Sequence, residues 1–198
     1  MKKLTYTAML LAAGLAIQSC GGPSSSTEKA DSSNAAKMDT SAKADSTTVK
    51  PGITVDETDA KFAVDAANGG MAEVALGKLA LTKTANAKVK EFANMMVNDH
   101  GKANEELMAL AKSKNITLPA TVSADKQKEA DDLGKKMGAD FDKAYVDAMV
   151  DGHKKTIAMF EDESKNAKDP DLKAFVDKTL PTIKTHLEHI EGIKASMK

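Results

Sequence analysis

The sequence predicts an all-α protein built on four long helices, and three observations support this fold class. Aromatic residues make up only 4% of the 198 residues and tryptophan is absent, whereas alanine, lysine, leucine and methionine, which favour helices, are abundant. Apolar residues recur at steps of three and four from about residue 56 onward. The breaks between these periodic stretches are short, except for one.

The composition also excludes several classes of protein. All 28 basic residues are lysine, and the formal net charge is -1, so the chain lacks the arginine side chains that bind phosphate and guanine through two parallel hydrogen bonds. We therefore expect no nucleic-acid partner. Cys20 is the only cysteine, which excludes a disulfide and a cysteine-ligated zinc or iron–sulfur site within one chain.

The N-terminal residues indicate a secreted, lipid-anchored protein. Two lysines precede an apolar run over residues 4–17, which matches a secretory signal and is shorter than the roughly 20 residues that span a membrane. The run ends in Ile17-Gln18-Ser19-Cys20, which resembles the bacterial lipobox. We therefore expect a signal peptide over residues 1–19, a lipidated Cys20 and a place in the cell envelope; a simple secretory signal is the alternative. By resemblance to sorted bacterial lipoproteins, Gly21 rather than aspartate after the cysteine implies the outer membrane.

Residues 20–55 are predicted to form a tether between the lipid and the folded domain. They are rich in serine, threonine, lysine and aspartate and contain almost no large apolar side chains. Such a segment buries too little surface to offset its ordering entropy, so we expect it to be disordered and to span about 30 to 35 Å. The folded domain is then expected over residues 56–198.

Each predicted helix follows from a local pattern. The first has an apolar face that includes Phe62 and Leu76, and the second has one that includes Phe92 and Leu107. A shorter, weakly amphipathic helix follows Pro119. The third long helix has an apolar face, and the fourth opens with an acidic cap and a proline at its first position. The expected ranges are about 58–82, 87–114, 123–137, 140–165 and 170–197.

Loop lengths predict the topology. The first two long helices are joined by about four residues, as are the last two, so each pair should form an antiparallel hairpin. About 25 residues with their own short helix separate the pairs, enough to return along a bundle about 40 Å long. This single long crossover is the ferritin-like four-helix arrangement. A plain up-down bundle is the alternative.

One ionisable residue on each long helix falls on or near the inward face. At 100° per residue, Glu73, His100, His153 and His186 align with the apolar residues of their helices and lie in the middle third of the bundle. Three imidazoles and one carboxylate would suit zinc, iron or copper, so the sequence predicts a transition-metal site. A polar network without metal is the alternative.

Three further residues could contribute to this site. Met96 and Met149 each stand one turn before an inward histidine, in a repeated Met-Val-x-x-His pattern, and thioether ligands would favour copper. Methionine also fills gaps in bundle cores, which is the alternative interpretation. Asp99 lies at the edge of the apolar stripe and could orient an imidazole, or it could be an exposed surface acid.

The folded part, in segments that include Met96–His100 and Tyr145–His153, resembles the domain-of-unknown-function family DUF4142, whose members are labelled outer-membrane proteins. The resemblance covers about residues 57–195. It implies a ferritin-like fold and the bacterial envelope, and it implies no reaction because the family has none assigned. Ferroxidase chemistry is not expected, because no inward histidine has a glutamate three residues before it and the Glu-x-x-His motif is therefore missing. The matching segments are Phe62–Val64, Gly69–Glu73, Val89–Ala93, Met96–His100, Ala103–Asn104, Tyr145–His153, and Leu180–Pro181 with His186.

The sequence therefore favours a binding protein over an enzyme. It contains no nucleophile elbow, phosphate loop or dinucleotide fingerprint, and hydrolysis by Glu73 and His100 would need an open cleft that the pattern does not indicate. The first hypothesis is a lipid-anchored envelope module that binds a metal through the Glu/His cluster. The second is a structural or stress-related envelope module that acts through protein partners and binds no metal.

Overall fold

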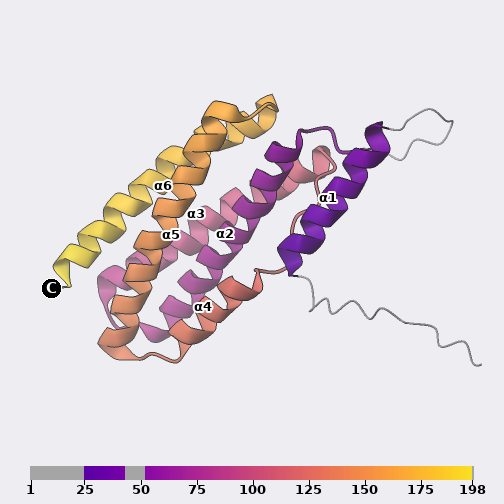
Figure 1. Cartoon of the computed structure of the whole chain (residues 1–198). Helices are drawn as coiled ribbons and strands as arrows, with labels where there is room; N and C mark the ends of the chain where they lie inside the picture. Colours follow the sequence, from indigo (N-terminus) through magenta and orange to yellow (C-terminus); the bar gives the residue numbers. More distant parts are fainter. Residues whose placement is uncertain (1–24, 43–51, 198) are drawn as a thin grey trace, which may run out of the picture.

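The computed structural model describes residues 25–42 and 52–197 (Figure 1). This part of the chain contains helices and no strands. The helices are α1 Ser26–Ala42, α2 Glu57–Lys83, α3 Ala87–Ser113, α4 Ala124–Gly134, α5 Gly138–Asn166 and α6 Pro170–Ser196. None of them has the length and apolar character needed to cross a bilayer. The predicted signal peptide and Cys20 lie outside the described residues.

The four long helices form a bundle of two hairpins, α2 with α3 and α5 with α6, and α4 lies in the connection between them (Figure 1). At one end, the backbone N–H of Thr54 donates to the carbonyl of Lys114 at 3.3 Å, and Lys168 pairs with Asp56 at 2.9 Å. At the other end, Lys83 donates to the carbonyl of Gly134 at 2.6 Å. The residues between α3 and α5 therefore return along the whole bundle. The ferritin-like crossover is confirmed, and the up-down alternative is wrong.

Side-chain caps explain where three of the long helices begin. The side chain of Asp56 accepts from the backbone N–H of Thr58, and Asn86 accepts from two N–H groups at the start of α3. Asp169 caps α6 in the same way, with Pro170 at the first helical position as predicted. These caps satisfy backbone donors that have no partner within the helix.

The hydrophobic core has two halves with a polar layer between them. One half lies towards the start of α2 and includes Phe62, Phe160 and Phe175. The other lies towards the end of α2 and includes Phe92 and Tyr145. The inward residues Glu73, His100, His153 and His186 each fall, along their helices, between residues of the first half and residues of the second.

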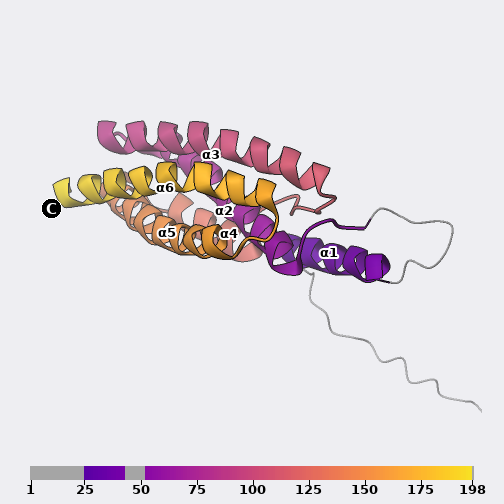
Figure 2. The ribbon, with the colours of Figure 1, turned by 90° about the horizontal axis from the view of Figure 1, so that it is seen from above.

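The prediction of a disordered tether over residues 20–55 is wrong for residues 26–42, which form α1. Both views place α1 at one end of the bundle (Figures 1 and 2). Ala30 and Asn34 are buried there, and Met38 packs against the core. Hydrogen bonds replace an apolar stripe in holding this helix: Asn34 donates to the carbonyl of Thr117 at 3.0 Å and accepts from its N–H at 2.7 Å. The helix depends on tertiary contacts, so the polar composition of this segment did not predict it.

Candidate metal centre

The polar layer brings together one ionisable side chain from each long helix. Glu73 comes from α2, His100 from α3, His153 from α5 and His186 from α6. Their exposed fractions are 6%, 5%, 0% and 1%. Their inward orientation follows from the helical period, since each stands about a turn from buried apolar residues of the same helix. The four predicted residues thus meet at one level of the bundle interior.

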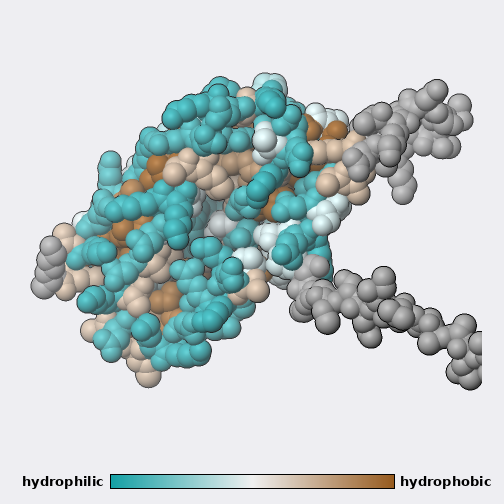
Figure 3. Space-filling model, in the orientation of Figure 1, coloured by the Kyte–Doolittle hydropathy of each residue, from teal (hydrophilic) through white to brown (hydrophobic). Residues whose placement is uncertain are grey.

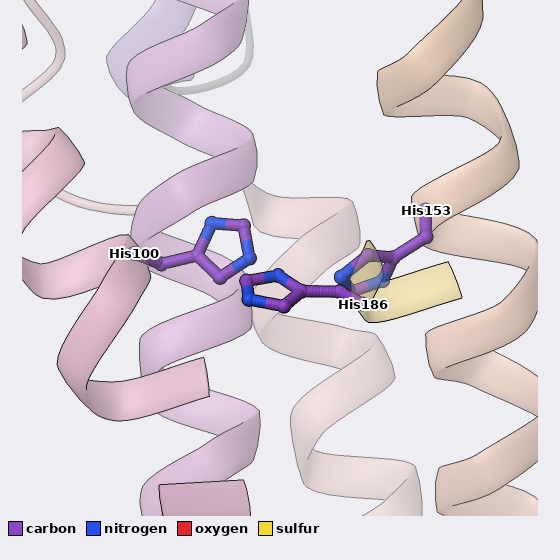
Figure 4. Close-up of side chains that lie close together, drawn as sticks. All are labelled: His100, His153 and His186. Carbon is purple, nitrogen blue, oxygen red and sulfur yellow. The ribbon is translucent and has the colours of Figure 1, made fainter. Parts of the chain in front are cut away.

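The three imidazoles face one another (Figure 4). The ring centroids of His100 and His186 are 5.2 Å apart, and that of His153 lies 5.6 Å from each of them. One ring nitrogen from each histidine lies within 4.8 Å of the corresponding nitrogens of the other two. Three nitrogen donors from three helices can therefore approach one small ion.

Each imidazole has one nitrogen in contact with an oxygen. Nδ1 of His153 lies 2.8 Å from the carbonyl oxygen of Met149, and Nε2 of His186 lies 3.0 Å from Oδ2 of Asp99. Nδ1 of His100 lies 2.9 Å from Oε2 of Glu73. Metal-binding histidines commonly donate their second nitrogen to such oxygens, which orients the ring.

The other nitrogen of each imidazole is buried without a hydrogen-bond partner among the described residues. These atoms are Nε2 of His100, Nε2 of His153 and Nδ1 of His186. Buried polar atoms without partners are rare because each costs about 1 to 3 kcal/mol. Three of them in one cluster indicate a ligand that would accept three lone pairs.

Burial sets the protonation of two of these histidines, His153 and His186. Burial lowers the pKa of His153, and it lowers that of His186 to about 4 despite the opposing hydrogen bond to Asp99. Both imidazoles are therefore neutral at pH 7, which is the form that binds metals. Burial alone would raise the pKa of Glu73, but the contact with His100 outweighs it and brings that pKa below its ordinary value.

Glu73 stands beside the histidine cluster as an acceptor. Its Oε1 lies 3.7 Å from Nδ1 of His153, and its Oε2 approaches His100, so it contacts the nitrogens turned away from the shared space. The cluster of mutually close ligand atoms comprises the three histidines without Glu73. Glu73, which the sequence predicted as a fourth ligand, lies beside this group, in contact with His100 and His153.

The other predicted residues have separate positions. Asp99 contacts His186, so it stands where it could orient that imidazole, as the sequence allowed. Met96 and Met149 are buried in the core half that includes Phe92, and the backbone carbonyl of Met149 contacts His153.

The sequence predicted Phe92 only as a core residue. Its ring lies 5.9 Å from that of His153 and 6.4 Å from that of His186, so it covers the cluster on one side.

The fold and the site define a ferritin-like helical bundle with three convergent histidines in its interior. The chain belongs to the family described as "Domain of unknown function (DUF4142)", whose profile matches residues 28–193. No curated protein matches the chain.

Several solved structures share the fold. The DUF305 fragment from Deinococcus radiodurans has a TM-score of 0.65 at 12% identity, and the match covers 72% of this chain and 98% of that one. CopM in the Cu(I)-bound form has a TM-score of 0.60 at 14% identity, covering 70% and 96%. CopM in the Cu(II)-bound form has a TM-score of 0.61 at 15% identity, covering 71% and 97%. At these identities the likeness establishes the fold alone.

Proposed function

We propose that this protein binds one transition-metal ion through His100, His153 and His186. The observation that carries the proposal is the set of three buried ring nitrogens that lack partners and point into one space. A polar layer with a purely structural role would pair these atoms with one another or with backbone groups. Here one nitrogen of each ring has an oxygen contact, and the other nitrogen is left for a ligand.

Copper fits the donor set best among the metals that the sequence allowed. Neutral imidazoles suit zinc, iron and copper, and the three-nitrogen set contains no carboxylate of the kind that iron sites commonly use. Structures with the same fold include CopM in Cu(I)-bound, Cu(II)-bound and Ag-bound forms. The buried thioethers of Met96 and Met149 belong to the adjoining core half, which makes the surroundings of the cluster favourable to a soft ion.

We further propose that the protein works in the bacterial envelope, attached through a lipid on Cys20. The support for this location is the lipobox-like sequence at the end of a signal-like apolar run. Mass spectrometry of the mature N-terminus after expression in a bacterial host with lipoprotein processing tests it. A diacylglyceryl or triacyl modification on Cys20 is the expected result, and an unmodified N-terminus at another residue would contradict it.

Metal content of protein produced without a histidine tag tests the binding site. Native protein purified from copper-supplemented cells is expected to contain about one copper ion per chain, and a bound ion should raise the melting temperature. Single changes His100→Ala, His153→Ala and His186→Ala should each abolish stoichiometric binding. His189→Ala is the matched control, because His189 lies on α6 beside His186 but outside the cluster.

The competing hypothesis, a structural module that acts through protein contacts, gives a different pattern. In that case each change in the cluster would destabilise the bundle, and neither copper nor zinc nor iron would bind to the native protein or change its melting temperature. Equal copper binding by the His189→Ala and His153→Ala variants would also contradict the proposed site.

A further inference from the structure

A cavity of about 190 Å³ lies beside the metal centre, between α2, α4 and α5. The face seen in Figure 3 is mostly hydrophilic and is hollowed between these helices. At its outer side the cavity is lined by charged residues of α2, α4 and α5, and at its inner side it reaches Glu73. Its lining includes Gly69, Glu73, Met149, Gly152, Thr156 and Met159.

Two helical glycines line this cavity without a packing reason. Glycine inside a helix costs about 0.5 to 1 kcal/mol relative to alanine, so it usually marks a place where helices approach closely. A Cβ added to Gly70 would meet the side chain of Asn104, and one added to Gly77 would meet the backbone of Ala93. A Cβ added to Gly69 or to Gly152 would meet nothing within 4 Å. Their absent side chains leave the cavity open.

The inner end of the cavity is a buried carboxylate. Glu73 is 6% exposed, and its Oε2 lies 2.9 Å from Nδ1 of His100. The same residue, together with Thr156, lines a second space of about 20 Å³ whose wall includes His100. Glu73 therefore stands between the cavity and the imidazoles, in contact with both His100 and His153.

The lining of the cavity suits a soft cation. Met149 and Met159 both line it, and thioether sulfur is a ligand for Cu(I) rather than for hard divalent ions. The acids of the outer part have lysine partners: Asp65 pairs with Lys61 at 2.9 Å, and Glu129 pairs with Lys126 at 3.2 Å. Among the described residues no lysine pairs with Glu73, whose contacts are with His100 and His153. Lys126 and Lys155 also line the cavity.

We infer that this cavity is the route by which Cu(I) reaches the histidine cluster. The ion passes Met149 and Met159, then Glu73, and is finally held by the three imidazoles. The inference rests on the proposed function, because it assigns a path to the ion that the cluster binds. No electron transfer is involved, since the ion enters and stays as Cu(I).

Filling the cavity at Gly69 tests the route. Gly69→Ala and Gly69→Leu add side chains into open space on a helix, so both variants should fold. Gly192→Leu is the matched control, because Gly192 is also a helical glycine with no atom within 4 Å of an added Cβ and does not line the cavity. Stopped-flow transfer of Cu(I) from a coloured chelator gives the loading rate, and competition with the same chelator at equilibrium gives the affinity.

Gly69→Leu is expected to slow loading and release by about tenfold or more and to leave the affinity within about twofold of the wild type, because a blocked path changes both rates equally. Gly69→Ala should have a smaller effect of the same kind, and Gly192→Leu none. Loading by Gly69→Leu at the wild-type rate would overturn the route while leaving the binding site intact. A wild-type protein that takes up no copper would overturn the proposed function instead.

Met159→Leu tests the thioether step, because leucine has a similar volume and lacks the sulfur. It should slow Cu(I) loading about threefold or more, with an unchanged circular-dichroism spectrum and melting temperature within a few degrees. An unchanged loading rate in this variant would show that the sulfur of Met159 does not bind the ion during loading, and would contradict that part of the path.

Discussion

Nε2 of His186 lies 3.0 Å from Oδ2 of Asp99, which joins α6 to α3 at the level of the three-histidine cluster. The histidine is 1% exposed, whereas the side chain of Asp99 is 38% exposed. A surface acid therefore fixes the orientation of a buried imidazole and directs its other nitrogen, Nδ1, into the cluster.

Asp99→Ala is expected to weaken copper binding by about 10- to 100-fold, because His186 would lose the acceptor that orients its ring. Glu106→Ala, on the same helix, removes another acid that contacts α6, through Lys178 at 2.7 Å, and should leave the affinity unchanged. Chelator competition at equilibrium measures both variants. Equal affinities for Asp99→Ala and the wild type would show that this contact does not support the site.

The stability of the bundle should also depend on Glu163, at the end of α5. Burial raises the pKa of its carboxyl to about 7, and the nearby aspartates, chiefly Asp59, add to this rise. Because the folded state holds the proton more tightly than the unfolded state, Glu163 favours folding below its ordinary pKa of about 4.5, and this contribution is lost as the pH rises through 7.

Glu163→Gln keeps the neutral form at every pH. Its unfolding free energy should match that of the wild type near pH 4.5 and exceed it by about 2 kcal/mol at pH 8. Urea denaturation of the metal-free protein at several pH values measures the difference. Glu161→Gln changes a solvent-side residue two positions away. Its difference in unfolding free energy from the wild type should not grow between pH 5 and 8. A constant difference between Glu163→Gln and wild type would mean that Glu163 is not protonated in the fold.

The contact between α1 and the loop after α3 rests on Asn34. Asn34→Ala removes two hydrogen bonds to Thr117 and leaves a backbone N–H in a part-buried place without its partner, so it should loosen α1 by about 1 to 3 kcal/mol. Amide hydrogen exchange over residues 26–38 measures this loosening. Asn94→Ala, which removes an exposed side chain bonded to its own helix at Lys90, should leave that exchange unchanged.

Two glycines of α2 should respond in opposite ways to the same substitution. Gly77→Ala would place its Cβ 3.0 Å from the backbone oxygen of Ala93, so the α2–α3 contact must widen and stability should fall by about 1 to 3 kcal/mol. Gly69→Ala meets no atom and should raise stability by about 0.5 to 1 kcal/mol through helix propensity. Thermal melts of the two variants compare them directly, and a loss of stability in Gly69→Ala would contradict the open space around that residue.

The long helices and their inward residues could be predicted because both depend on a local period. Glu73, His100, His153 and His186 lie where a rotation of 100° per residue places them, and the crossover follows from loop length. The role of Glu73 beside His100 could not be predicted, since it depends on rotamers and on distances of an ångström. Likewise α1 has no apolar stripe, and its helix depends on Thr117, which is remote in sequence.

The three histidines come from both hairpins of the bundle: His100 comes from α2–α3, and His153 and His186 come from α5–α6. Covalently, the two hairpins are joined only through the crossover between α3 and α5. An ion held by all three rings would be a second junction between them, of a reversible kind. A protein nicked by protease in the crossover should therefore resist dissociation into fragments while loaded, and should come apart more readily once a chelator has removed the ion.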